Sequence, residues 1–90
     1  MPDEPILREK ARKAIQSGEL PLQRPDRVFG GTGIGAVCLV CGETIQRDQQ
    51  ELEIEFTRPG AEIGLERYHL HPRCFAAWEF ERTKGETARS

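Results

Sequence analysis

The sequence predicts one small α+β domain in which a helix, a cysteine-containing turn, an antiparallel β-hairpin and a second helix follow in that order. All three cysteines fall into two short pairs, Cys38-x2-Cys41 and His71-x2-Cys74. Residues 51–57 alternate between acidic and apolar side chains, as a half-buried strand does. Leu, Ile, Val and Phe account for 20 of the 90 residues. So few apolar residues make a marginal core, and a bound zinc ion is expected to stabilise it.

The first predicted element is a helix over residues 4–17. Asp3 can act as its N-cap, Pro5 suits its first turn, and Gly18 ends it. Its opposite face is basic but is interrupted by glutamates, which favours a solvated surface over a recognition surface. The apolar positions that recur at the helical period are Leu7, Ala11, Ala14 and Ile15.

A connector rich in proline and glycine is predicted to follow this helix, and the two together make up residues 1–35. Prolines exclude a continuous helix here. The glycine run at 30–35 resembles a phosphate-binding loop, but no Gly-Lys-Ser/Thr sequence is present, and the strand and helix that must flank such a loop are not predicted. We therefore expect a flexible approach to the first cysteine, with Val28 and Phe29 as apolar anchors.

The predicted zinc-binding domain spans residues 36–83. It opens with a turn over residues 36–45, here called the cysteine turn, which carries Cys38 and Cys41. The alternation over residues 51–57 places Leu52, Ile54 and Phe56 toward the core and Glu51, Glu53 and Glu55 toward water. The remaining predicted elements are a Pro59-Gly60 turn, a return strand over 65–70, a helix over 72–83 packed through Phe75, Trp78 and Phe80, and a disordered tail over 84–90.

Cys38, Cys41, His71 and Cys74 are the predicted ligands of one structural zinc ion. Structural zinc takes four cysteine or histidine ligands in a tetrahedron. Gly42 tolerates the tight backbone after a C-x2-C turn, and Pro72 suits the start of a helix that carries Cys74.

Other interpretations of these residues stay open. His69 is the alternative fourth ligand, although the spacing of His71 to Cys74 suits a helix start better. A redox C-x-x-C pair and incidental buried cysteines are less favoured, because a redox pair needs a βαβ context.

The order of these elements resembles a treble-clef zinc finger. Over residues 36–82 the spacing Cys38-x2-Cys41-x29-His71-x2-Cys74, with Tyr68 shortly before His71, looks like the zinc finger of the poly(ADP-ribose) polymerase type. That resemblance implies the four zinc ligands and a DNA-binding function. The whole chain is also similar to small uncharacterised bacterial zinc-binding proteins, a resemblance that implies no function.

The charge distribution favours a protein partner over nucleic acid. Residues 42–66 carry seven acidic and two basic side chains, whereas phosphate binding needs the opposite sign. A protein-interaction or regulatory module is therefore the expected function, with DNA or RNA binding as the alternative. The acidic hairpin and the region of Val28 and Phe29 are the expected protein-contact surfaces. The candidate nucleic-acid contacts are Arg8, Arg12, Lys13, Arg67, Arg73 and Arg82.

Three further expectations concern chemistry and location. Three thiolates leave zinc electron-rich, and no catalytic triad stands out, so the protein is not expected to be an enzyme. No apolar stretch approaches the length that spans a membrane, and the first residues lack the pattern of a signal peptide. An odd number of cysteines in metal-ligand spacing suits a reducing compartment, which predicts a cytoplasmic protein.

Overall fold

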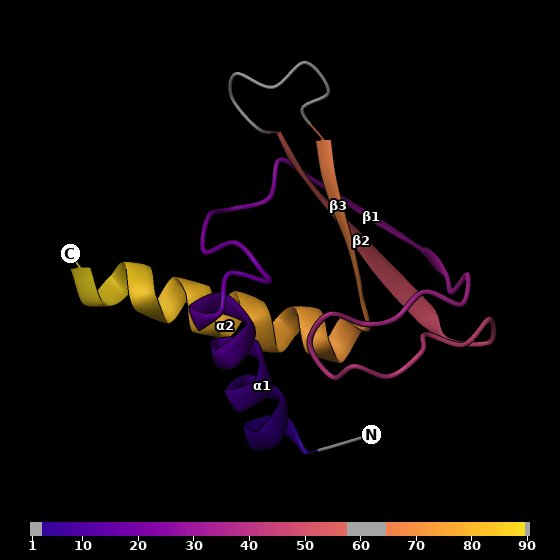
Figure 1. Ribbon diagram of the computed structural model, residues 1–90, viewed down its shortest axis with the longest axis horizontal. Coiled ribbons are helices and arrows are strands. Elements are labelled where there is room, and N and C mark those ends of the chain that lie inside the picture. Colours follow the sequence, from indigo (N-terminus) through magenta and orange to yellow (C-terminus); the bar gives the residue numbers. More distant parts are fainter. Residues whose placement is uncertain (1–2, 58–64, 90) are drawn as a thin grey trace.

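The computed structural model describes residues 3–57 and 65–89. It has five elements, α1 (Glu4–Gln16), β1 (Arg27–Thr32), β2 (Gln50–Thr57), β3 (Leu65–Leu70) and α2 (Pro72–Arg89), and the three strands form one antiparallel sheet in the order β1-β2-β3 (Figure 1). This arrangement confirms the predicted α+β fold class. Among the described residues, no helix has the length and apolar character needed to cross a membrane.

Helix α1 packs against α2 through the apolar stripe that its sequence predicts. Leu7, Ala11 and Ala14 are buried. Asp3 stands at the predicted N-cap position, but its side chain makes no capping hydrogen bond. Gly18 has a φ of 83°, a left-handed conformation in which glycine is favoured, and the helix ends just before it.

The core lies between the two helices and one face of the sheet, and Trp78 of α2 is at its centre. Its side chain is fully buried, and its indole N–H donates to the Pro21 carbonyl oxygen at 3.0 Å. The Phe56 ring meets it edge-on at 6.1 Å, and the Phe75 ring lies 5.8 Å away. Trp78 of α2 therefore contacts both the segment after α1, through Pro21, and the sheet, through Phe56.

Strand β1 occupies part of the segment that was expected to be a flexible connector. Its six residues pair with β2, from Arg27 opposite Glu55 to Thr32 opposite Gln50. Val28 and Phe29 remain 45% and 47% exposed, so they do not act as buried anchors. Backbone pairing, and not apolar burial, attaches this segment to the rest of the domain.

The glycine-rich segment after β1 makes one close backbone contact, at Gly33. A Cβ atom there would overlap the Gln46 carbonyl oxygen and would lie 2.9 Å from both the Ile45 carbonyl oxygen and Cγ2. The Gly33 N–H also donates to the Gln49 carbonyl oxygen at 2.9 Å. The segment is thus packed against residues 45–49 and needs glycine at this position.

Gly33→Ala is expected to destabilise the domain by about 1–3 kcal/mol, because the added methyl group overlaps the Gln46 carbonyl oxygen and the backbone must shift to accommodate it. Thermal unfolding of the zinc-loaded protein measures this loss. Gly31→Ala is the matched control, since a Cβ atom at Gly31 meets nothing within 4 Å. Equal stability of the two variants would contradict the close contact at Gly33.

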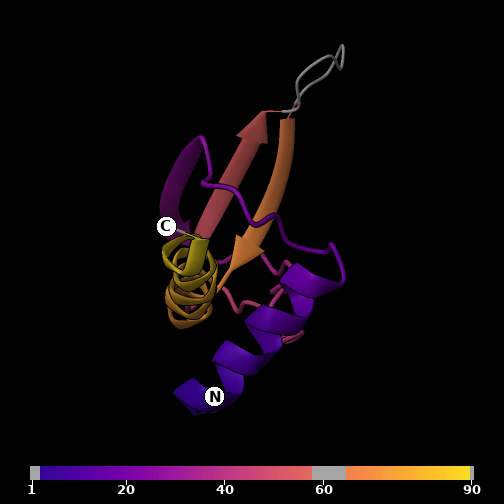
Figure 2. The ribbon, with the colours of Figure 1, turned by 90° about the vertical axis from the view of Figure 1, so that its left-hand side faces the viewer.

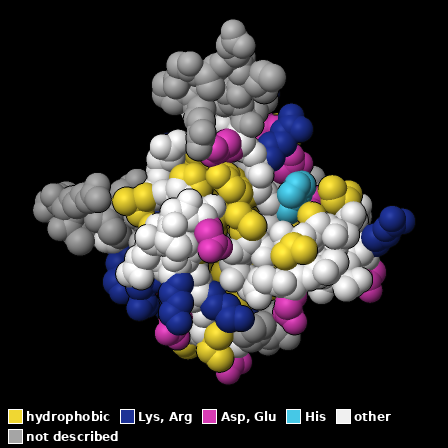
Figure 3. Space-filling model, in the orientation of Figure 1, with side chains coloured by type: hydrophobic (Ala, Val, Ile, Leu, Met, Phe, Trp, Pro, Cys, Tyr) yellow, Lys and Arg dark blue, Asp and Glu magenta, His cyan; other side chains and the backbone are white. Residues whose placement is uncertain are grey.

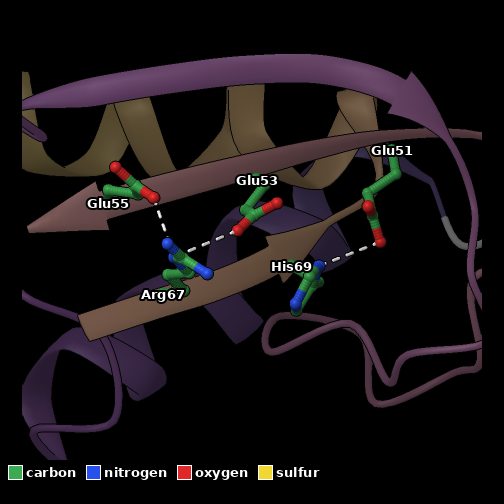
Figure 4. Close-up of polar contacts among 5 residues, drawn as sticks. All are labelled: Glu51, Glu53, Glu55, Arg67 and His69. Carbon is green, nitrogen blue, oxygen red and sulfur yellow. Dashed lines mark hydrogen bonds and ion pairs between the residues drawn. The ribbon is translucent and has the colours of Figure 1, made fainter. Parts of the chain in front are cut away.

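The acidic face of β2 is not the solvated surface that the alternation predicts. Glu51 and Glu55 are 6% and 5% exposed, because β2 is the central strand and both neighbouring strands flank its carboxylates. Figure 4 shows Arg67 and His69 of β3 reaching toward them. The apolar face agrees better with prediction, since Ile54 and Phe56 are buried.

Two other expectations concern the ends of predicted elements. Helix α2 continues to Arg89, past the boundary at residue 83 where the sequence predicts a disordered tail. The predicted Pro59-Gly60 turn lies outside the described residues.

Candidate metal centre

The cysteine turn is a tight backbone loop in which the thiols of Cys38 and Cys41 are buried. The Cys38 N–H donates to the Glu43 carbonyl oxygen at 2.9 Å, and the Gly42 N–H donates to the Cys38 carbonyl oxygen at 3.0 Å. Gly42 has a φ of 78°, which confirms the need for glycine after Cys41. A bridge between Val37 and Thr44 closes the turn.

The second pair of candidate ligands, His71 and Cys74, lies at the junction between β3 and α2. Pro72 begins the helix, and the His71 carbonyl oxygen accepts the Phe75 N–H at 2.8 Å, as the residue at a helix N-cap does. Cys74 follows in the first turn. The Leu39 N–H donates to the His69 carbonyl oxygen at 3.2 Å, so a backbone hydrogen bond joins the cysteine turn to the end of β3.

These two segments bring Cys38, Cys41, His71 and Cys74 together, with their ligand atoms all within 4.8 Å of one another. The His71 Nδ1 atom is 3.4 Å from the Cys41 sulfur and 4.0 Å from the Cys74 sulfur. A tetrahedral zinc site with ordinary bond lengths has edges of roughly 3.5–3.8 Å between ligand atoms. The four side chains are buried, so this cluster can hold one metal ion, and its donor set suits zinc.

The three thiols lie close enough together to shift one another's pKa values. A hydrogen bond from the Cys74 thiol lowers the pKa of Cys38 to about 4. The same hydrogen bond raises the pKa of Cys74, and burial raises the pKa of Cys41. Hydrogen bonds from neighbouring groups, first of all the Cys74 thiol, therefore favour the thiolate form of Cys38. A bound divalent cation would replace the thiol protons.

His69, the alternative fourth ligand, lies apart from the cysteines. Its Nδ1 atom is 3.0 Å from a carboxylate oxygen of Glu51 on β2 (Figure 4). Glu51, Glu53 and His69 form a second group whose ligand atoms are mutually within 4.8 Å. In that group Glu53 also lies 3.6 Å from the Arg67 guanidinium. The structure thus brings His71, and not His69, to the three sulfurs.

Gln49 is a contributor to the site that the sequence analysis missed. Its Oε1 atom is 3.2 Å from the Nε2 atom of His71 and accepts the Gln46 N–H at 2.8 Å. A proton on Nε2 that is held by Gln49 leaves the lone pair of Nδ1 directed at the sulfurs, where a metal ion would bind. No sequence signal marks this glutamine, because its role depends on the loop that folds it back over His71.

Gln49→Ala is expected to lower zinc affinity by about 10–100-fold, because loss of the acceptor frees the ring orientation and tautomer of His71. Competition against a chromophoric chelator measures this affinity. Gln50→Ala, a change at the exposed neighbouring position, is expected to leave the affinity unchanged. An affinity unaltered by Gln49→Ala would show that the ring needs no support from this loop.

Most of the candidate nucleic-acid contacts lie beside carboxylates. Lys and Arg side chains gather around α1, with acidic side chains among them (Figure 3). Five of the six candidates are in ion pairs, and any phosphate would have to compete with their carboxylates. Among the described residues no ion pair involves the exposed Arg73. The pairs are Arg8–Glu4, Arg12–Glu81, Lys13–Glu9, Arg67–Glu55 and Arg82–Glu79, at nitrogen–oxygen distances of 2.8, 3.0, 3.7, 2.8 and 2.6 Å.

Comparison of this chain with known proteins gave no match to a protein-family model, to a curated protein or to a solved structure. The case for a metal centre therefore stands on the geometry and chemistry of these four side chains.

Proposed function

We propose that this protein binds one zinc ion at Cys38, Cys41, His71 and Cys74, and that the ion is structural. The observation that carries this proposal is the burial of all four donors. Cys38, Cys74 and His71 are at most 2% exposed, and Cys41 is 9% exposed. Four protein ligands complete a tetrahedron and leave no position for water or substrate, which supports a structural role over a catalytic one. A cysteine turn, a sheet and a helix that starts at the site support a treble-clef relationship.

The zinc-stabilised domain acts, in this proposal, as a protein-interaction or regulatory module. Large apolar side chains are exposed along β1, in the segment after it and at the start of the cysteine turn, including Ile34 at 65% and Val37 at 56%. Exposed apolar side chains that form a contiguous patch mark contact surfaces, and these residues are the candidates for such a patch. The acidic face of β2 is a weaker candidate for such a surface, because its carboxylates are paired with Arg67 and His69.

Metal analysis of the protein purified without added metal tests the first part of the proposal. We expect one zinc ion per chain, measured by elemental mass spectrometry, and loss of that zinc when Cys38 and Cys41 are both changed to serine. A wild-type chain that carries no zinc, and that gains none from a zinc-containing medium, would refute the structural site.

Nucleic-acid binding is the second candidate function. It is less favoured than binding of a protein partner, because most of the candidate basic residues are in ion pairs. The two are separated by titrating nicked and single-stranded DNA, and RNA, at low and moderate salt. Binding that declines steeply with salt would favour nucleic acid. Capture of a specific protein that survives the same salt, and that is lost on Val37→Lys, would favour the interaction module.

A further inference from the structure

Strand β1 forms an outer edge of the sheet and is open to solvent along its whole length. Figure 2 shows it beside β2, with no described strand on its other side. All six of its residues are exposed. A row of unpaired backbone donors and acceptors therefore faces solvent at this edge.

The two edges of the sheet differ in chemistry. Native edge strands are commonly protected from pairing by charged side chains, prolines or bulges. β3 has such protection, since Glu66, Arg67 and His69 lie along it. The sequence of β1 is Arg-Val-Phe-Gly-Gly-Thr, and its only charged side chain is that of Arg27, the first residue. Charged side chains therefore do not protect this edge from pairing with another strand beyond its first residue.

The pairing with β2 identifies which backbone groups face outward. The Gly33 N–H donates to the Gln49 carbonyl oxygen, so this pair is a hydrogen-bonded one. Residues of an antiparallel pair alternate between hydrogen-bonded and non-bonded positions. By that alternation, Val28, Gly30 and Thr32 direct their N–H and C=O groups away from β2 and toward an incoming strand.

We propose that two copies of this chain pair antiparallel through their β1 strands, about a two-fold axis at Gly30, to give one continuous six-stranded sheet. The strand is complementary to itself in this register. Phe29 of one copy lies across from Gly31 of the other, and Val28 lies across from Thr32. The Phe29 ring thus covers a glycine that otherwise leaves backbone exposed, and Val28 and Thr32 form a pair of β-branched side chains, which suit a sheet.

The fold of a single chain leaves space for side chains at positions 30 and 31. A Cβ atom at Gly30 would meet only the Leu52 side chain, at an ordinary 3.6 Å, and one at Gly31 would meet nothing within 4 Å. Neither glycine has a positive φ. Glycine is therefore not required at either position by the fold of one chain, whereas in the proposed pairing Gly31 leaves space for the Phe29 ring of the other copy.

Sedimentation equilibrium of the zinc-loaded wild-type protein tests this pairing. We expect twice the mass of one chain at high micromolar concentration. Gly30→Lys is expected to halve the mass, because it sets two ammonium groups opposite each other at the axis. Ile6→Lys, which adds the same charge at an exposed site on α1, should remain dimeric. A monomeric wild-type protein, or a Gly30→Lys variant that stays dimeric, would overturn the proposal.

A cross-linking pair tests the register directly. Residues opposite each other at a hydrogen-bonded position have Cα atoms about 5.5 Å apart, within the range of a disulfide. Zinc-loaded Gly30→Cys is expected to form a disulfide-linked dimer with oxidised glutathione. Gly31→Cys is not, because its copies lie on either side of the axis, beyond the roughly 7 Å limit. Equal cross-linking of both variants, or of neither, would overturn the two-fold register.

This inference goes beyond the proposed interaction with another protein and fails separately from it. A chain that binds zinc and captures a partner while remaining monomeric would overturn the β1 pairing alone. A dimer that captures no partner would support the pairing and count against the wider interaction role.

Discussion

His71→Ala is expected to abolish the zinc-dependent folding of this domain, whereas His69→Ala leaves a folded, zinc-loaded protein. His71 is 2% exposed, and its Nδ1 atom faces the cysteine sulfurs. Binding of a structural zinc contributes roughly 10–16 kcal/mol to folding in small zinc domains, and a domain of this size has only about 5–15 kcal/mol of stability in total. Loss of one ligand therefore removes most of what holds the chain folded.

Far-ultraviolet circular dichroism during titration with zinc measures this difference. A strong chelator added to the wild-type protein should reproduce the spectrum of His71→Ala. His69→Ala supplies the matched control, because it deletes an imidazole two residues away that pairs with Glu51 instead of the cysteines. A wild-type chain that keeps its spectrum in chelator would refute the dependence of the fold on metal. Folding failure of only the His69 variant would move the fourth ligand to that residue.

Trp78→Ala is expected to destabilise the zinc-loaded protein by about 3–5 kcal/mol, the usual cost of removing a large buried ring. The indole contacts Phe56 and Phe75 and donates a hydrogen bond to the Pro21 carbonyl oxygen. Its removal leaves a cavity where the helices and the sheet meet, and it also leaves that carbonyl oxygen without its indole partner. Urea unfolding at saturating zinc measures the free-energy loss.

Phe80→Ala is the control for this second prediction. Phe80 lies two residues further along α2, is 44% exposed and has the Arg8 guanidinium 4.1 Å above its ring. Its loss is expected to cost about 1 kcal/mol, the scale of an exposed cation–π contact. If the two variants lose equal stability, the core is not centred on Trp78.

Several features of this fold could be predicted from local sequence alone. The ligand spacing, Gly42 and Pro72 are local signals, because a tight turn and a helix start depend on only a few consecutive residues. The strand over residues 51–57 was equally clear from its alternation. Each of these features depends on backbone chemistry within one short segment.

The features that could not be predicted depend on contacts between distant segments. Strand β1 contains Gly30 and Gly31, which are poor strand formers, and it becomes a strand only by pairing with β2. The alternation over residues 51–57 identifies two faces but does not reveal that β2 is central, so the burial of Glu51 and Glu55 was missed. Ion pairing of the basic residues likewise joins side chains far apart in sequence, as Arg12 and Glu81 are.

Cys74 lies one helical turn before Trp78 on α2, so the proposed zinc site would link the supply of metal to the lifetime of the whole protein. A candidate zinc ligand and the centre of the core share one rigid helix, so neither can melt without disturbing the other. With zinc bound at the proposed site, free zinc would set the fraction of unfolded chain by mass action. Cellular proteases remove unfolded chains. The abundance of this protein is consequently expected to rise and fall with available zinc, even at a constant rate of synthesis.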